Sequence, residues 1–157
     1  MSSNLKNDLG ALLDNTQPIL IVEDSMPDFQ AITRVFRKLR IDNPVFHCET
    51  GQKALDFLFR RGADSDPDKS PRPGLILLDL NLPETDGREV LKLIKSDGDL
   101  KSIPTVIFTT SESDKDINEC YQNGANSYIT KPVDLERLLD VISMLRAYWF
   151  ETVALPQ

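Results

Sequence analysis

Five short apolar runs alternate with helix-like segments along this sequence of 157 residues. The runs are continuous rather than alternating in polarity, which is typical of strands buried on both faces of a sheet. They cover residues 19–22, 44–48, 75–79, 105–109 and 127–130. Strands separated by helices connect through right-handed crossovers and lie parallel in one sheet. We therefore predict an α/β fold of the (βα)5 type, a five-stranded parallel sheet with helices on both faces.

Apolar residues at spacings of three and four predict the helices between these strands. The predicted helices begin after Ser25 and after Pro132, or span residues 51–59, 88–94 and 113–122. The helix after Pro132 repeats large apolar side chains as far as Trp149, which makes it strongly amphipathic. We divide the chain into an N-terminal arm (1–17), one domain (18–147) and an aromatic C-terminal tail that continues the last helix (148–157).

Residues 61–74 interrupt this alternation with a loop that is rich in aspartate and proline. Its acidic residues lack the spacing, the central glycine and the final glutamate of a calcium-binding loop. We therefore predict a solvated insertion at this point of the chain.

The composition argues against several classes of function. A formal charge of -7 disfavours nucleic-acid binding, which needs clustered Lys and Arg. No run approaches the roughly 18 apolar residues that span a bilayer, and the N-terminus lacks the pattern of a signal peptide. Cys48 and Cys120 are far apart and His47 is the only histidine, so we expect no thiolate metal site and a structural role for His47. The sequence predicts a soluble, cytoplasmic protein.

Chemically active side chains stand at the ends of four predicted strands. They are the acidic pair Glu23–Asp24 after the first strand, Asp79, Thr109 and Lys131. Open parallel sheets bind their ligands at the carboxyl ends of the strands. Singly, these residues are explained by a helix cap, a β-former or a surface lysine. Together at one edge of one sheet, they predict a site for a divalent cation and a phosphoryl group.

The Asp79 carboxylate can accept a phosphoryl group as an acyl phosphate once the charge repulsion is relieved. Magnesium suits this task because it binds a few carboxylates and retains several waters. We predict a magnesium site formed by Glu23, Asp24, Asp79 and the backbone carbonyl of Asn81. The hydroxyl of Thr109 and the ammonium of Lys131 suit the remaining phosphoryl oxygens.

Other classes of protein also carry an aspartate at a strand end. An aspartate-nucleophile phosphatase of the haloacid-dehalogenase type needs a second Asp two residues later, where this sequence has Asn81. A flavin-binding electron carrier needs a hydroxyl- and glycine-rich loop after the first strand, but residues 23–28 would repel the flavin phosphate. A structural adaptor that is never phosphorylated on Asp79 stays open.

These motifs resemble the receiver domain of bacterial two-component response regulators. The resemblance covers residues 19 to about 145 and rests on Glu23–Asp24, Asp79, Pro83, Gly87, Thr109, Tyr128 and Lys131–Pro132. It implies a flavodoxin-like sheet in the order 2-1-3-4-5. It also implies that Asp79 takes a phosphoryl group from a histidine of a sensor kinase, with magnesium bound. In the family's switch, Thr109 moves toward the phosphoryl group, Tyr128 turns inward and Lys131 pairs with the phosphoryl oxygens.

Three segments resemble the stand-alone regulators that partner cyanobacterial phytochromes. They are the insertion at 62–73, Phe108–Ser111 and Tyr148–Glu151. Thr110 is larger than the residue that many receivers have there, so we expect it to restrict access to Asp79. Too few residues follow Lys131 for a DNA-binding output domain, so we expect output through protein–protein contacts.

Three aromatic residues, Tyr148, Trp149 and Phe150, end the final helix, and aromatic residues are enriched at interface hot spots. We predict a homodimer through the C-terminal helix, with Leu138 and Ile142 on the same contact face. The alternative, that Trp149 continues the core stripe, stays open.

Overall fold

The computed structural model describes residues 17–156 and contains one parallel sheet. Its strands are β1 (Ile19–Val22), β2 (Val45–Cys48), β3 (Leu75–Leu78), β4 (Thr105–Thr109) and β5 (Ser127–Thr130). Their spatial order is β2-β1-β3-β4-β5, and every neighbouring pair is parallel. The predicted flavodoxin-like (βα)5 sheet of order 2-1-3-4-5 is therefore confirmed.

Five α-helices connect and cover these strands. They are α2 (Met26–Lys38), α3 (Gly51–Phe59), α4 (Gly87–Ser96), α5 (Asp114–Gln122) and α6 (Leu135–Leu145). The residue before each helix accepts a hydrogen bond from a backbone N–H of the first turn, through the side chains of Ser25, Thr50, Asp86, Ser113 and Asp134. Such a cap stabilises a helix by about 1 kcal/mol. Short polar residues therefore fix where each helix begins.

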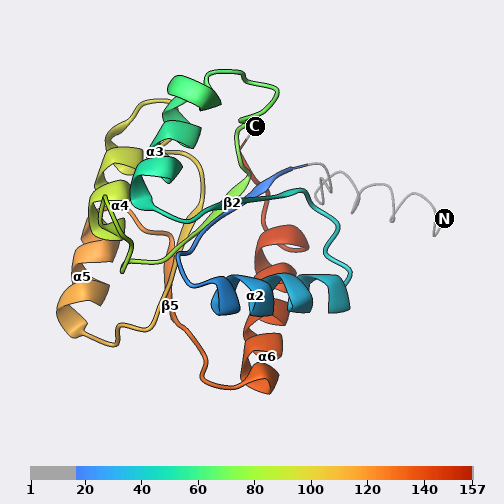
Figure 1. Cartoon of the computed structure of the whole chain (residues 1–157). Coiled ribbons are helices and arrows are strands. Elements are labelled where there is room, and N and C mark those ends of the chain that lie inside the picture. The colour runs from blue at the N-terminus through green and yellow to red at the C-terminus, as the bar shows by residue number, and fades with distance from the viewer. Residues whose placement is uncertain (1–16, 157) are drawn as a thin grey trace.

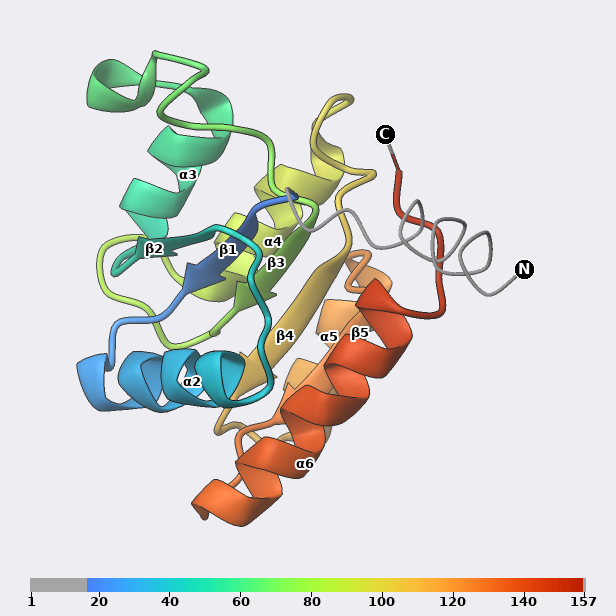
Figure 2. The same ribbon diagram turned by 90° about the vertical axis from the view of Figure 1, so that its right-hand side faces the viewer.

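The helices form two layers with the sheet between them. Helices α3, α4 and α5 lie on one side of the sheet, and α2 and α6 lie on the other (Figures 1 and 2). Successive strand residues point to opposite faces, so Leu20 and Val22 join one core and Ile19 and Ile21 join the other. This two-sided burial explains why the strands are continuous apolar runs.

Several element boundaries differ from those predicted. Strand β2 begins at Val45 rather than at Pro44, since a proline has no N–H to donate to a sheet. Strand β3 ends at Leu78, which leaves Asp79 in the loop beyond it. Helix α4 begins at Gly87, because Asp86 is its cap. The predicted N-terminal arm lies outside the described residues except for Gln17.

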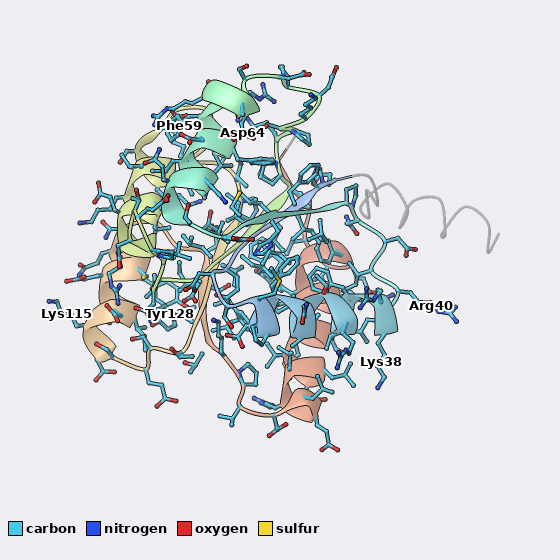
Figure 3. The ribbon with its side chains drawn as sticks, viewed as in Figure 1. Lys38, Arg40, Phe59, Asp64, Lys115 and Tyr128 are labelled. Carbon is cyan, nitrogen blue, oxygen red and sulfur yellow. The ribbon has the colours of Figure 1, made fainter. Side chains whose placement is uncertain are left out.

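The acidic insertion is anchored to the end of α3. Arg60 Nε donates to the carbonyl of Ser70 at 3.1 Å, and Arg72 donates to the carbonyl of Leu58. Ser70 is fully buried, whereas most of the loop around it is exposed. Figure 3 shows Asp64 next to Phe59 at this end of the molecule, in a short 3-10 turn (Gly62–Asp64). The insertion is therefore a folded extension that precedes the amino end of β3, whereas the predicted site lies at the carboxyl ends of the strands.

The C-terminal aromatic segment differs most from its predicted role. After α6 the chain continues as a π-helical turn, Arg146–Phe150. Four of the five predicted dimer-contact residues are buried in the core that α6 shares with α2, namely Leu138, Ile142, Trp149 and Phe150. We correct the predicted contact set accordingly, because side chains that fill their own core cannot also cover a partner. Only Tyr148, which is 53% exposed, stays available at the surface.

Among the helices of residues 17–156, none combines the length and the apolar character that a bilayer-spanning helix needs.

Candidate functional site

The parallel register brings the carboxyl ends of β1, β3, β4 and β5 to one edge of the sheet. The Asp79 N–H donates to the carbonyl of Val22 at 3.0 Å, which ties the end of β3 to the end of β1. The Lys131 N–H donates to the carbonyl of Thr109 at 2.7 Å and ties β5 to β4 in the same way. Backbone pairing thus gathers the residues that the sequence had placed at separate strand ends.

Three carboxylates form an acidic cluster at this edge. Oxygen atoms of Glu23, Asp24 and Asp79 lie within 4.8 Å of one another. Glu23 is 2% exposed and Asp79 is 5% exposed, whereas Asp24 faces solvent. Neither oxygen of Glu23 has a hydrogen bond of standard geometry within residues 17–156. Closely spaced carboxylate oxygen atoms are ligands that a hard divalent cation prefers, so these residues fit a metal ion.

Lys131 supplies a positive charge that offsets the three carboxylates of the cluster. Its Nζ lies 2.9 Å from Asp79 Oδ2 and 3.0 Å from Asp28 Oδ2, and it also forms an ion pair with Glu23. Burial lowers the pKa of Lys131, but its bonds to Glu23, Asp79 and Asp28 outweigh burial and raise that pKa. Lys131 therefore stays charged at physiological pH.

The two buried carboxyls have pKa values that are shifted in opposite directions. Burial and the neighbouring Asp79 raise the pKa of Glu23 to about 8, although Lys131 opposes this shift. Burial also raises the pKa of Asp79, but its bonds to Glu23 and Lys131 outweigh burial and lower it. Because like charges in one site cannot both ionise freely, Asp79 ionises at a lower pH than Glu23.

We expect divalent-cation binding to strengthen as the pH rises toward 8. Below the pKa of Glu23, a metal ion competes with the proton on Glu23. The dissociation constant of the metal ion should therefore rise by up to about tenfold for each pH unit by which the pH is lowered. Between 4.5 and 8 the metal-free folded chain also binds more protons at Glu23 than the unfolded chain, so the stability that Glu23 contributes falls as pH rises through this window. Calorimetric titration with Mn²⁺ at several pH values measures the first effect.

The matched control for this titration is Glu23→Gln, which removes the titrating proton and keeps the shape of the side chain. Its cation binding should be weaker and nearly independent of pH over the same range. An equally steep pH dependence in Glu23→Gln would show that another group binds the competing proton.

Thr109 and Tyr128, the two predicted switch residues, lie on neighbouring strands. Thr109 is fully buried, and its Oγ1 makes no hydrogen bond of standard geometry within residues 17–156, although its hydroxyl acts to lower the pKa of Asp79. The Tyr128 hydroxyl donates to the carbonyl of Ser111 at 2.9 Å. Figure 3 shows Tyr128 on the side of the sheet that α5 covers. The hydroxyl of Thr109 is thus beside the acidic cluster, and the Tyr128 side chain is held by the loop after β4.

The loop after β4 is tied to α4 by a network that the sequence did not indicate. Arg88 donates to both oxygens of Asp116 at 2.8 Å, and Ser111 Oγ donates to the same carboxylate at 2.6 Å. The bonds from Arg88 and Ser111 lower the pKa of Asp116 to about 2. Nothing in the spacing of residues 88, 111 and 116 marks them as partners, because the fold alone brings α4 beside α5.

The remaining predicted residues lie around the cluster. The Asn81 N–H donates to Asp79 Oδ1 at 3.3 Å, and a metal bond to its carbonyl stays a prediction. Thr110 is exposed and shares a hollow of about 350 Å³ with Asp28 and Lys131.

His47 stacks on Phe29 with ring centroids 3.7 Å apart, and its Nε2 lies 2.7 Å from the carbonyl oxygen of Glu23.

Among the ion-pair partners of Lys131 within residues 17–156, Asp28 is the one that the sequence prediction missed. It was included only in the acidic loop that disfavours a flavin phosphate, and it stands in the first turn of α2, where acidic residues are common for helix stability alone. One signal was available. Asp28 lies one helical turn after the Ser25 cap at the mouth of the predicted site, so its side chain starts near the strand ends.

A doubly wound parallel sheet with an acidic cluster, a buried threonine and a lysine at the carboxyl ends of its strands defines the receiver class of signalling domain. This chain belongs to the response regulator receiver domain family, which matches residues 19–143. It is 43% identical to the response regulator Rcp1 of Synechocystis sp. over 88% of this chain and 92% of that protein.

Two solved structures extend the comparison. The Mn²⁺-bound form of response regulator Rcp1 is 42% identical, with a TM-score of 0.83, and the match covers 90% of this chain and 99% of that one. The phosphorylated cyanobacterial phytochrome response regulator RcpA is 37% identical, with a TM-score of 0.85 over the same shares of the two chains. The predicted resemblance to phytochrome response regulators is confirmed at the level of sequence and fold.

Proposed function

We propose that this chain is a cytosolic phosphoacceptor whose Asp79 takes a phosphoryl group from a histidine of a sensor kinase in a magnesium-dependent reaction. The observation that carries the proposal is the ion pair between Lys131 Nζ and Asp79 Oδ2 at 2.9 Å, within an acidic cluster 4.8 Å wide. That arrangement lowers the pKa of Asp79, as a nucleophile at neutral pH requires, and places the Lys131 ammonium beside the Asp79 carboxylate.

The side chains around Asp79 have separate roles in this transfer. Glu23 and Asp24 would hold the magnesium ion together with Asp79, and the bound ion would neutralise charge on the phosphoryl oxygens. Lys131 keeps its ammonium within reach of the same oxygens. Thr109 has a buried hydroxyl that already acts on Asp79, so it can donate to a phosphoryl oxygen there.

The test of this function uses a small phosphoryl donor in place of the kinase. Incubation with phosphoramidate and Mg²⁺ should add one phosphate that is stable in acid and labile in base, as expected for an acyl phosphate. Chelation of the metal should suppress the reaction. A chain that acts only as a structural adaptor would take no phosphate under either condition.

We also propose that the phosphorylated state is transmitted through Thr109 and Tyr128. When Thr109 turns to the phosphoryl group, it leaves space on the side of β5 where Tyr128 is partly buried. The Tyr128 ring would then exchange its bond to Ser111 for that space. Because Ser111 also binds Asp116, this exchange would reach the loop between β4 and α5.

A phytochrome is the proposed kinase partner. The support is the likeness to RcpA, a cyanobacterial phytochrome response regulator, over 90% of this chain. Phosphotransfer from candidate phytochrome kinases, compared with transfer from unrelated sensor kinases, tests this pairing. A rate that is no faster with phytochromes would reject it.

We propose a homodimer through the outer face of α6 and the turn after it. Met144 and Tyr148 are 59% and 53% exposed there, and with Ile129 they line a hollow of about 430 Å³. Tyr148→Asp should convert the dimer to a monomer by placing a charge in the contact, whereas Leu93→Asp on α4 should not. Light scattering at tens of micromolar protein measures both. A wild-type chain that stays monomeric, with and without phosphorylation, would remove the dimer.

A further inference from the structure

Asp28 contacts the catalytic lysine from outside the acidic cluster. Its Oδ2 lies 3.0 Å from Lys131 Nζ, which also lies 2.9 Å from Asp79 Oδ2 and pairs with Glu23. An ammonium group has three hydrogens, so each can point to a different carboxylate. We propose that Asp28 is a positioning residue that draws Lys131 toward the mouth of the pocket and weakens its pairing with a phosphoryl group on Asp79. This inference rests on the proposed function.

The geometry distinguishes this role from ordinary helix capping. The cap of α2 is already formed, since Ser25 Oγ accepts from the Asp28 N–H at 3.3 Å. Within the described residues, the hydrogen bond that the Asp28 carboxylate accepts comes from Lys131 Nζ. The backbone of Lys131 is fixed by its hydrogen bond to the carbonyl of Thr109. Only the lysine side chain can therefore move between Asp28 and the acidic cluster.

The burial of the two groups shows the direction in which Asp28 pulls. The Lys131 side chain is 9% exposed, whereas that of Asp28 is 45% exposed. Asp28 lines the hollow beside the site, together with Thr110 and Pro132. A bond between a buried ammonium and a half-exposed carboxylate pulls the ammonium away from the cluster and toward that hollow.

The same contact places a negative charge close to the Asp79 carboxylate. Oxygen atoms of Asp28 and Asp79 both lie within 3.0 Å of one nitrogen, so the two carboxylates are near neighbours. A phosphoryl group adds further negative charge at Asp79. Asp28 therefore disfavours the phosphorylated form in two ways, by sharing the lysine and by repelling the new charge.

The experiment follows phosphorylation of the full chain by phosphoramidate with saturating Mg²⁺. In this reaction the P–N bond of the donor breaks, a P–O bond forms to Asp79, and the departing ammonia takes a proton. Asp28→Asn should raise the rate constant about fivefold, the effect expected of one half-exposed ion pair. The matched control is Asp134→Asn, which removes one charge from the rim of the same hollow and keeps an oxygen for the α6 cap. It should change the rate less than about twofold.

A double-mutant cycle tests whether Asp28 acts through Lys131. In a Lys131→Ala background, Asp28→Asn should lose most of its accelerating effect, because there is no longer a lysine ammonium for Asp28 to draw away from Asp79. A second readout is the ¹H–¹⁵N signal of the Lys131 ammonium in the unphosphorylated chain, which Asp28→Asn should shift and Asp134→Asn should not. A role confined to helix stability would alter the unfolding midpoint and leave this signal unchanged.

The outcomes separate this inference from the proposed function. A wild-type chain that takes no phosphate would overturn the proposed function itself. A phosphorylated wild type with equal rates for Asp28→Asn and Asp134→Asn would overturn only the role of Asp28. Acceleration of equal size with and without Lys131 would also overturn it, because charge repulsion alone would then explain the effect.

Discussion

Replacement of Asp79 by Asn should abolish phosphorylation by a small donor, with a loss of at least about 1000-fold in the rate constant. The amide keeps the size of the side chain and its position at the end of β3, but it is not a nucleophile toward phosphorus. Intact-protein mass spectrometry after incubation with phosphoramidate and Mg²⁺ measures the product. Asp114→Asn, on the exposed first turn of α5, is the matched control and should react at the wild-type rate.

Two results would contradict this expectation. Phosphate retained by Asp79→Asn in a base-labile form would place the acceptor on another carboxylate, of which Glu23 and Asp24 are the nearest. Phosphate retained in a base-stable form would indicate a hydroxyl acceptor such as Thr109. Both results would leave the receiver fold intact and remove the assigned role of Asp79.

Gly87→Ala should strongly destabilise the fold. A Cβ at Gly87 would lie 2.1 Å from the carbonyl oxygen of Asp79 and 2.6 Å from Leu80 Cα. Both are backbone atoms, so the neighbours cannot turn away as a flexible side chain would. The hydrogen bond from the Gly87 N–H to the carbonyl of Leu80, at 2.9 Å, holds the two segments at this spacing.

We expect a loss of about 3 kcal/mol in the free energy of unfolding, the upper part of the range for overpacking. Urea denaturation followed by circular dichroism measures it. Gly98→Ala is the matched control, because nothing lies within 4 Å of a Cβ at Gly98, and it should be neutral or slightly stabilising. Equal stability of the two variants would mean that the loop after Asp79 moves freely away from α4.

The predicted elements agree with the structure where a local signal marks them. The runs at 19–22, 105–109 and 127–130 have the predicted bounds, since each is a short apolar or β-branched run closed by polar residues. Helix starts agree to within one residue at Ser25 and Ser113, because a capping side chain acts on its own first turn. Strand order was not visible in any such signal and came from the family resemblance.

Apart from the element boundaries, the predictions that needed correction concern contacts between distant elements. The stripe that includes Trp149 is apolar whether it faces α2 or a second protein, and its composition does not distinguish the two. The π-helical turn at Arg146–Phe150 places both Trp149 and Phe150 in the core, whereas Tyr148 remains outside. The pairing of Arg88 with Asp116, and of Lys131 with Asp28, likewise depends on which helices the sheet brings together.

The sequence by itself determined the kinds of groups at the strand ends and the side of the sheet where they gather. It could do so because the carboxyl ends of parallel strands coincide whatever their order. Only the tertiary structure decided how charge is shared there: the pKa of Glu23 is raised, the pKa of Asp79 is lowered, and Lys131 pairs with Glu23, Asp28 and Asp79. Burial and distances of about 3 Å fix that division, since electrostatic interactions depend on both, and neither quantity is local in the sequence.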